Sequence, residues 1–275
     1  MKSAWSRRRD RARHWLARDS PAEEMLLFYL ELLELQEPIY RQALESDWGT
    51  AVETGSWFLH PERITASSLL PGFRKLLRAV APATDVLTEV ARTLESSSDA
   101  KLTALLESFL RRTPLEEIDL GHEAVQLEFF PRAFLEPVAE ALREKTSPTE
   151  DGLRIEGSCP RCGWPPQVGV LRDEPEAKGR RLLVCSLCSA WWRVPRARCP
   201  GCGETDPARL GHYVSESVPH VRIDECRTCR AYLKTVDLRK DGMAVPVVED
   251  LASVELDLWS REQGLRKLRR NLLGF

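Results

Sequence analysis

Two copies of one pentapeptide pattern, Cys159-Pro160-Arg161-Cys162-Gly163 and Cys199-Pro200-Gly201-Cys202-Gly203, govern the architecture predicted for this chain. A further Cys-x-x-Cys pair follows each copy, after 22 residues in the first case (Cys185/Cys188) and 23 in the second (Cys226/Cys229). The segment is therefore an internal repeat with a period of about 40 residues. Its eight cysteines are all the cysteines of the 275-residue chain.

The spacing of these cysteines predicts two four-cysteine metal sites. Two cysteines separated by two residues can both coordinate one metal ion from a tight turn. A second such turn supplies the other two ligands of a tetrahedral site. The glycine after each opening pair suits a turn that needs a positive φ. The matching intervals group the first pair with the second and the third with the fourth. The predicted ligands are Cys159, Cys162, Cys185 and Cys188 in site one, and Cys199, Cys202, Cys226 and Cys229 in site two.

Each repeat is thus typical of a rubredoxin-like or zinc-ribbon module. Tetrahedral sulfur suits both iron and zinc, so the residues leave the metal open. Structural disulfides are an alternative, but no feature of the chain marks it as secreted, and cytosolic thiols stay reduced. A thioredoxin-like redox pair would need a strand-to-helix setting and would not occur in four copies.

Composition narrows the function classes. The net charge is −2 and the pI is about 6.3, so a global basic field for nucleic acid is lacking. No apolar run reaches the roughly 18 residues of a membrane span. The basic run Arg7–Arg9 is followed by mostly polar residues, without the apolar core of an export signal. We therefore expect a cytoplasmic protein without a membrane span.

The sequence predicts an α+β multidomain chain. An all-α N-terminal domain is followed by two tandem metal modules and a C-terminal helix, and the hydrophobic fraction of 43% is sufficient for buried cores. Helical patterns include Asp99–Arg111, with one apolar stripe, and a last helix over Pro131–Lys145. The predicted boundaries are 1–147 for the helical domain, 153–196 and 197–245 for the two modules, and 249–273 for the C-terminal helix.

Short strands are predicted between the cysteine turns, where residues alternate or run apolar. These runs are Val168–Leu171, Arg181–Val184, Trp191–Val194, His212–Val214, Pro219–Ile223 and Tyr232–Val236. Adjacent residues on a strand point to opposite faces, so either Trp191 or Trp192 should face outward. An exposed tryptophan is a good interface anchor, which makes both residues candidates for partner binding.

The residues that carry these patterns resemble the formate dehydrogenase accessory protein family (FdhE). The resemblance rests on the Cys159 motif with Pro165-Pro166 and Gly169-Val170-Leu171, on Cys226-x-x-Cys229-x-x-Tyr232-Leu233-Lys234, and on Glu249-Asp250-Leu251-Ala252-Ser253. It is dense from 159 to 264, while residues 1–147 are only compatible with the family's helical domain. It implies a cytoplasmic assembly chaperone, not an enzyme. It also implies two rubredoxin-type iron ions per chain, and the catalytic subunit of respiratory formate dehydrogenase as the partner.

Two other functions stay open on the residues alone. One is a zinc-ribbon protein that binds nucleic acid, which would need a basic face interleaved with aromatics, against the overall charge. The other is a rubredoxin-like electron carrier, which would need an accessible iron site. No Ser-His-Asp triad, carboxylate pair or phosphate loop is apparent in the sequence. We therefore predict a non-enzymatic protein.

Overall fold

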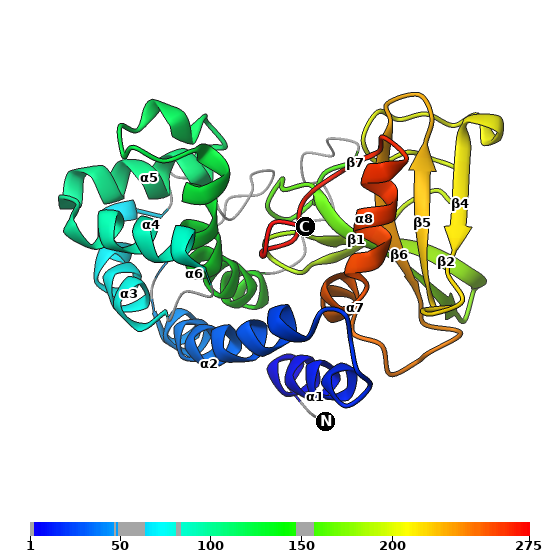
Figure 1. Ribbon diagram of the computed structural model, residues 1–275, viewed down its shortest axis with the longest axis horizontal. Coiled ribbons are helices and arrows are strands. Elements are labelled where there is room, and N and C mark those ends of the chain that lie inside the picture. Colours follow the sequence, from blue (N-terminus) through cyan, green and yellow to red (C-terminus); the bar gives the residue numbers. More distant parts are fainter. Residues whose placement is uncertain (1–2, 47, 49–63, 81–83, 147–156) are drawn as a thin grey trace. The chain divides into compact units, whose positions relative to one another are not determined.

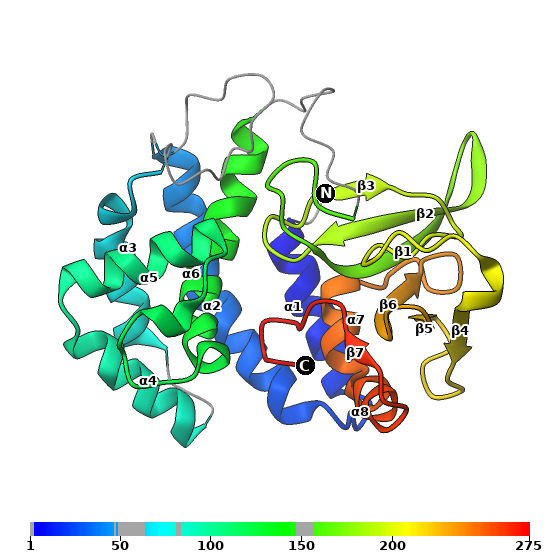
Figure 2. The same cartoon turned by 90° about the horizontal axis from the view of Figure 1, so that it is seen from above.

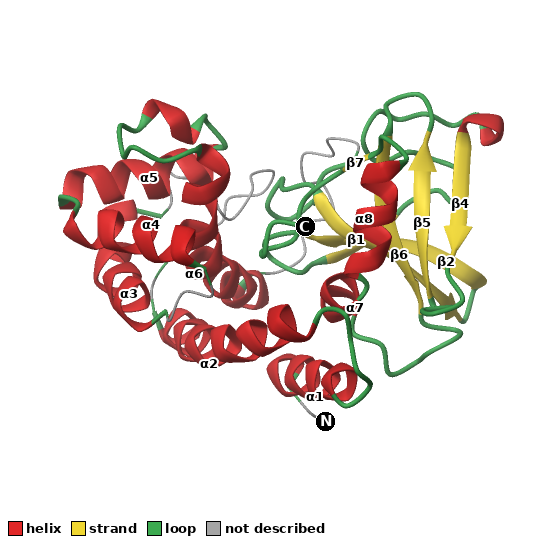
Figure 3. Ribbon diagram, in the orientation of Figure 1, coloured by secondary structure: helices red, strands yellow, loops and turns green. Residues whose placement is uncertain are grey.

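The described part of residues 3–146 is helical, whereas residues 157–275 contain the strands together with short helices, which Figure 3 colours separately. The computed structural model describes residues 3–46, 48, 64–80, 84–146 and 157–275. The chain divides into two units: unit 1 joins Met1–Leu30 to Arg154–Leu273 and Phe275, and unit 2 comprises Glu31–Leu153 and Gly274. The predicted linker between residues 147 and 153 lies outside the described residues.

The N-terminal region is helical, as predicted. Its elements are α1 (Ala4–Leu16), α2 (Glu23–Glu45), α3 (Ala66–Ala79), α4 (Asp85–Ser96), α5 (Asp99–Arg111), the short 3-10 helix η1 (Leu115–Glu117) and α6 (Ala124–Lys145). The apolar stripe of α5 is buried, which places it in the core of unit 2. The predicted start of the last helix at Pro131 is wrong, because α6 begins at Ala124 and contains both Pro131 and Pro137. Within the described residues, we find no helix long and apolar enough to cross a bilayer.

Unit 1 is built on one seven-stranded sheet (Figure 1). Its strands are β1 (Pro166–Glu174), β2 (Ala177–Cys185), β3 (Trp191–Arg193), β4 (Leu210–Val214), β5 (Val221–Cys226), β6 (Ala231–Asp237) and β7 (Arg266–Lys267). The order is β3-β2-β1-β6-β5-β4, with β7 also paired to β6. All six predicted runs overlap β1–β6, so the strand predictions are confirmed.

Strands β1 and β6 join the two modules into this single sheet. They pair in parallel, with Gly169 opposite Thr235. A Cβ atom on Gly169 would lie 2.3 Å from Thr235 Oγ1, closer than side chains approach. Glycine at position 169 therefore leaves room for the side chain of Thr235, its partner across the strand pair.

The tail does not form the single helix predicted over 249–273. The structure shows two short helices, α7 (Pro246–Ala252) and α8 (Val254–Glu262), followed by β7. Gly264 has a φ of +69°, and the N–H of Leu265 reaches back to the carbonyl of Ser260 over 2.9 Å. This is a glycine C-cap, so Gly264 ends the helix rather than weakening its interior.

A buried charge cluster links the sheet to this tail, and we define it as Lys234, Asp250, Asp257 and Lys267. In Figures 1 and 2, α7 and α8 lie beside β6. Lys234 Nζ lies 3.0 Å from Asp250 and 2.7 Å from Asp257, and Lys267 Nζ lies 2.7 Å from Asp250. The carboxylates lower the free energy of burying the ammonium groups, so each charge compensates the burial of another.

Helix α1 belongs to unit 1, although the sequence predicts one helical domain over 1–147. Its Arg11 forms ion pairs with Glu249 of α7 and with Asp241, the latter at 2.7 Å. Trp15 Nε1 donates to Glu249 over 3.0 Å, and His220 Nε2 lies 2.8 Å from the same carboxylate. The Glu249 side chain is fully buried, so these contacts hold α1 against α7.

Replacing Glu249 with glutamine should therefore release α1 from unit 1. Loss of one partner leaves Arg11 buried with less compensation, which costs about 3 kcal/mol. Urea denaturation should show a lower midpoint, and limited proteolysis should cut near residues 17–22 first. The control is Glu262→Gln, which changes an exposed glutamate on α8. Equal midpoints for the two variants would contradict the prediction.

The same substitution predicts a pH dependence. Burial raises the pKa of Glu249, but hydrogen bonds from His220 and Arg11 outweigh it and hold the pKa below its ordinary value. A lowered carboxyl pKa stabilises the fold above the unfolded value of about 4.3, and this contribution is lost as the pH falls through the folded pKa. The difference in unfolding free energy between wild type and Glu249→Gln should be largest at pH 7 and should decrease towards pH 3. A difference that is constant over this range would contradict it.

Candidate metal centres

Site one lies between the loop that precedes β1 and the end of β2. The two opening cysteines of the first repeat and the pair Cys185/Cys188 come together there, all buried. The Sγ atoms of Cys162 and Cys185 are 3.3 Å apart, and those of Cys159 and Cys188 are 3.7 Å apart. Gly163 has a φ of +75°, as the predicted turn requires.

Site two repeats this arrangement between the loop after β3 and the β5–β6 connection. The Sγ atoms of Cys199 and Cys229 are 3.8 Å apart, and those of Cys202 and Cys226 are 3.6 Å apart. Gly203 has a φ of +80°, and its N–H donates to the Cys199 carbonyl over 3.0 Å. The equivalent bond in site one, from Gly163 to Cys159, is 2.8 Å long. The structure therefore groups the eight cysteines as their spacing predicts.

The sulfur geometry fits a four-coordinate metal ion. With metal–sulfur bonds of about 2.3 Å, a tetrahedron has sulfur atoms about 3.8 Å apart. A disulfide would require about 2.05 Å, far below the separations in either cluster. Backbone N–H groups also point at sulfur, with Arg161 donating to Cys159 over 3.4 Å and Gly201 donating to Cys199 over 3.3 Å. Such bonds stabilise thiolate ligands.

Electrostatics in site one favours a bound cation. Burial raises the pKa of the Cys162 and Cys188 thiols well above the ordinary value. Hydrogen bonds from the three neighbouring cysteines lower the pKa of Cys159. Burial thus opposes ionisation of at least two of the four thiols, and a cation between the sulfurs would offset that cost for a cluster of four thiolates. In site two, burial raises the pKa of Cys199 to about 12.

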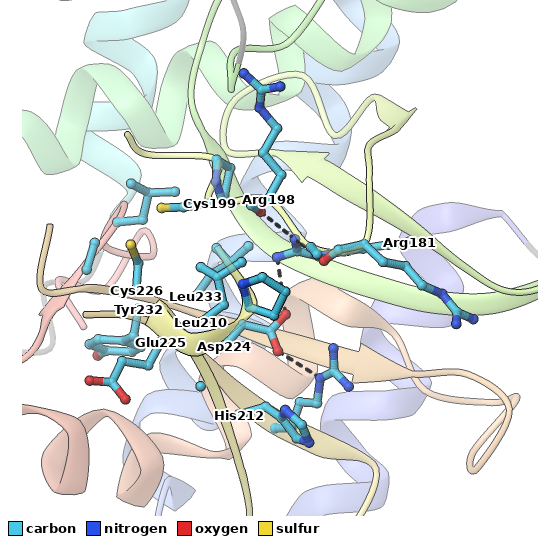
Figure 4. A pocket seen from close by; sticks show the side chains of 18 residues that line it. Arg181, Arg198, Cys199, Leu210, His212, Asp224, Glu225, Cys226, Tyr232 and Leu233 are labelled. Carbon is cyan, nitrogen blue, oxygen red and sulfur yellow. Dashed lines mark hydrogen bonds and ion pairs between the residues drawn. The ribbon is translucent and has the colours of Figure 1, made fainter. Parts of the chain in front are cut away.

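A cavity of about 340 Å³ adjoins site two, and Figure 4 shows Cys199 and Cys226 at one end of it. Arg181 of β2 is buried beside it and donates to the carbonyl of Arg198 over 2.7 Å and to Asp224 over 3.2 Å. It therefore ties the first module to the loop that carries Cys199. In the sequence, Arg181 is distinguished only as a charged residue at the start of a predicted apolar strand.

The two candidate tryptophans lie on β3, at one edge of the sheet. Trp191 is 38% exposed and Trp192 is half-buried. The guanidinium of Arg172 lies 5.5 Å from the centre of the Trp191 ring. The structure thus places Trp191 on the surface, where a cation lies over its ring.

Loss of a cysteine should remove the ion from its cluster and unfold the surrounding strands. Binding of a structural metal contributes on the order of 10 kcal/mol to the folding free energy of a small module, so the module does not stay folded without it. Cys226→Ser should lower the metal content by one ion per chain and expose residues 197–245 to protease. The helices of unit 2 should stay intact by limited proteolysis.

Thr228→Ser is the matched control, since it changes a residue inside the same Cys-x-x-Cys turn without removing a sulfur. Cys159→Ser should produce the corresponding loss in the first module. A Cys226→Ser protein that keeps two ions and native protease resistance would show that this cluster is not a structural metal site.

Comparison with known proteins agrees with this architecture. The family model for the FdhE central domain matches residues 158–196, and the model for the FdhE C-terminal domain matches residues 197–273. The crystal structure of the FdhE protein from Pseudomonas aeruginosa superposes with a TM-score of 0.74. That match covers 99% of this chain and 97% of the other at 24% identity, so it shows a common fold.

Similar curated sequences carry the same name. The FdhE homolog of Aquifex aeolicus is 34% identical over 192 residues, which is 70% of this chain and 65% of the relative. The alignment with the Stutzerimonas stutzeri homolog spans 42% of this chain and 37% of that relative. A homolog from Haemophilus influenzae is 25% identical over 97% of this chain and 86% of its own length. The chain that folds around these two cysteine clusters is similar to FdhE proteins over nearly its whole length.

Proposed function

We propose that this protein is a non-enzymatic accessory factor that assists assembly of the catalytic subunit of respiratory formate dehydrogenase in the cytoplasm. Similarity to FdhE proteins, dense over residues 158–273, is the observation that carries the proposal. The site chemistry supports it: among the described residues, the groups of side chains suited to a metal are the two cysteine clusters. Four thiolates fill a tetrahedron and leave no position for a substrate, unlike catalytic zinc sites.

The metal we propose is iron, with one ion in each cluster and zinc as the alternative. Both metals accept four thiolates in similar geometry, so availability decides which one occupies the sites. Iron would add the capacity to change oxidation state with little movement of its ligands. The cysteines of this chain would supply the thiolates, and the backbone N–H groups of Arg161 and Gly201, which donate to two of the sulfurs, would tune it.

Protein prepared anaerobically from its native host should therefore contain two iron ions and absorb visible light. Ferric tetrathiolate is red because charge moves from sulfur to iron on excitation, whereas the zinc form is colourless. Elemental analysis together with the visible spectrum makes the measurement, and a zinc-reconstituted sample serves as the colourless reference. Native protein that contains zinc alone would refute the iron proposal.

Trp191 is the residue we propose as an anchor for the partner. It is an exposed aromatic on the edge strand β3, beside site one. An aromatic anchor buried at an interface contributes about 2 kcal/mol or more, which is roughly a thirtyfold change in affinity. Trp192 is more enclosed, so its role is expected to be packing within the first module.

Trp191→Ala should weaken binding to the formate dehydrogenase catalytic subunit about thirtyfold while metal content stays normal. Trp192→Ala should instead lower the thermal stability of the first module. Tyr213→Ala is the matched control, because Tyr213 is 39% exposed on β4 at the other end of the sheet. Co-purification and affinity measurements with the full chain test the function itself, and failure of the wild type to bind this subunit would overturn it. Binding that Trp191→Ala leaves unchanged would exclude only the β3 surface.

A further inference from the structure

The two cysteine clusters differ in their access to solvent. Every cysteine of site one is at most 3% exposed. In site two Cys202 is exposed and Cys229 is half-buried, while Cys199 and Cys226 are buried. The repeated sequence therefore produces two sites with the same ligands and different surroundings.

Site one is enclosed by neighbouring side chains from distant parts of unit 1. Trp164, directly after its first turn, is 5% exposed, and Arg269 of the tail lies 5.1 Å from the centre of its ring. Arg8 of α1 donates to Ser189, next to Cys188, over 3.1 Å. A molecule approaching these sulfurs would have to displace α1 or the tail.

Site two is flanked by open space. A cavity of about 250 Å³ is lined by the turn that carries Cys199 and Cys202, together with Arg198. The larger cavity in Figure 4 reaches Cys199 and Cys226. Since a water molecule takes up about 30 Å³, each cavity has room for several atoms of a small ligand beside the sulfurs.

The turn of site two lacks two of the side chains that its counterpart carries, although Leu268 of the tail lies 2.8 Å from where a Cβ atom on Gly201 would fall. Gly201 stands where site one has Arg161, and the position after Gly203 is Glu204 where site one has the buried Trp164. Among the described residues, a Cβ atom on Gly203 would meet within 4 Å only the Arg198 guanidinium, at 3.5 Å. The sequence thus omits, at site two, the aromatic that encloses site one.

We propose that site two is an exchangeable metal site, which gives up its ion to small soluble ligands with thiolate or nitrogen donors, while the enclosed site one retains its ion. In this exchange each metal–sulfur bond that breaks is replaced by a bond from the ion to the incoming donor. The freed thiolate takes a proton from water, and no electron is transferred. The inference rests on the proposed function only in that both clusters hold a metal.

Chelator competition on the full chain loaded with zinc tests this difference. Zinc released to excess chromogenic pyridylazo chelator should appear in two equal phases, each of one ion per chain. The faster phase should exceed the slower at least about tenfold, equivalent to about 1.4 kcal/mol in activation free energy. Cys202→Ser should abolish the fast phase and keep the slow one, and Cys162→Ser, its counterpart in the repeat, should do the reverse.

A second measurement uses only the wild type, in case Cys162→Ser fails to fold. Brief chelation followed by alkylation with N-ethylmaleimide and peptide mass spectrometry should label Cys202 and Cys229 before any cysteine of site one. Release in a single phase, or labelling of both sites together, overturns the inference. Fewer than two zinc ions bound at the outset would instead overturn the metal content of the proposed function.

Discussion

The parallel pairing of β1 with β6 is the contact on which the rest of unit 1 depends. Each cysteine module is too small to bury much apolar surface alone, and the pairing joins both into one sheet with one core. At Gly169 it depends on the absence of a side chain, because the side chain of Thr235 on β6 fills that space. The same pairing brings β6 to the centre of the sheet, where Lys234 can reach the tail helices.

The buried charge cluster then sets how the tail folds over that sheet. Lys234 contacts both Asp250 of α7 and Asp257 of α8, so a single ammonium group holds two short helices. Lys267 on β7 reaches the same two aspartates. Burying charges costs more than burying apolar side chains, so this arrangement favours one unique placement of the helices over maximal stability. Packing of apolar stripes alone would specify that placement less strictly.

Local chemistry made much of unit 1 predictable from the sequence. The cysteine intervals specify which sulfurs meet, and the glycine after each opening pair marks the turn, since both depend on residues close in the chain. The strands were predicted from runs in which apolar residues alternate with polar ones or follow one another. The tail was mispredicted because its leucines step by three and four, whereas Gly264 adopts a positive φ that ends α8. Pro131 suggested a helix start, yet it lies within α6 because the preceding turns are held by packing in unit 2.

Long-range contacts account for what the sequence could not reveal. The docking of α1 depends on Arg11 and Glu249, which are 238 residues apart. The spacing of apolar residues along the chain gives no indication of such a distant pairing. The unequal exposure of the two clusters has the same origin, since α1 and the tail come from opposite ends of the chain to cover site one. Only the missing counterpart of Trp164 after Gly203 hinted at it.

The return of α1 to the C-terminal sheet has a consequence for synthesis on the ribosome. Residues 31–153 form a continuous segment that can fold as soon as it emerges, because domains generally fold as units during translation. Helix α1 emerges earlier, but its partner Glu249 is translated more than 200 residues later. At roughly 5–20 residues per second, the buried face of α1 waits on the order of ten seconds or more without its native contact. The N-terminal helix can therefore complete its native contacts only after both cysteine clusters have been translated.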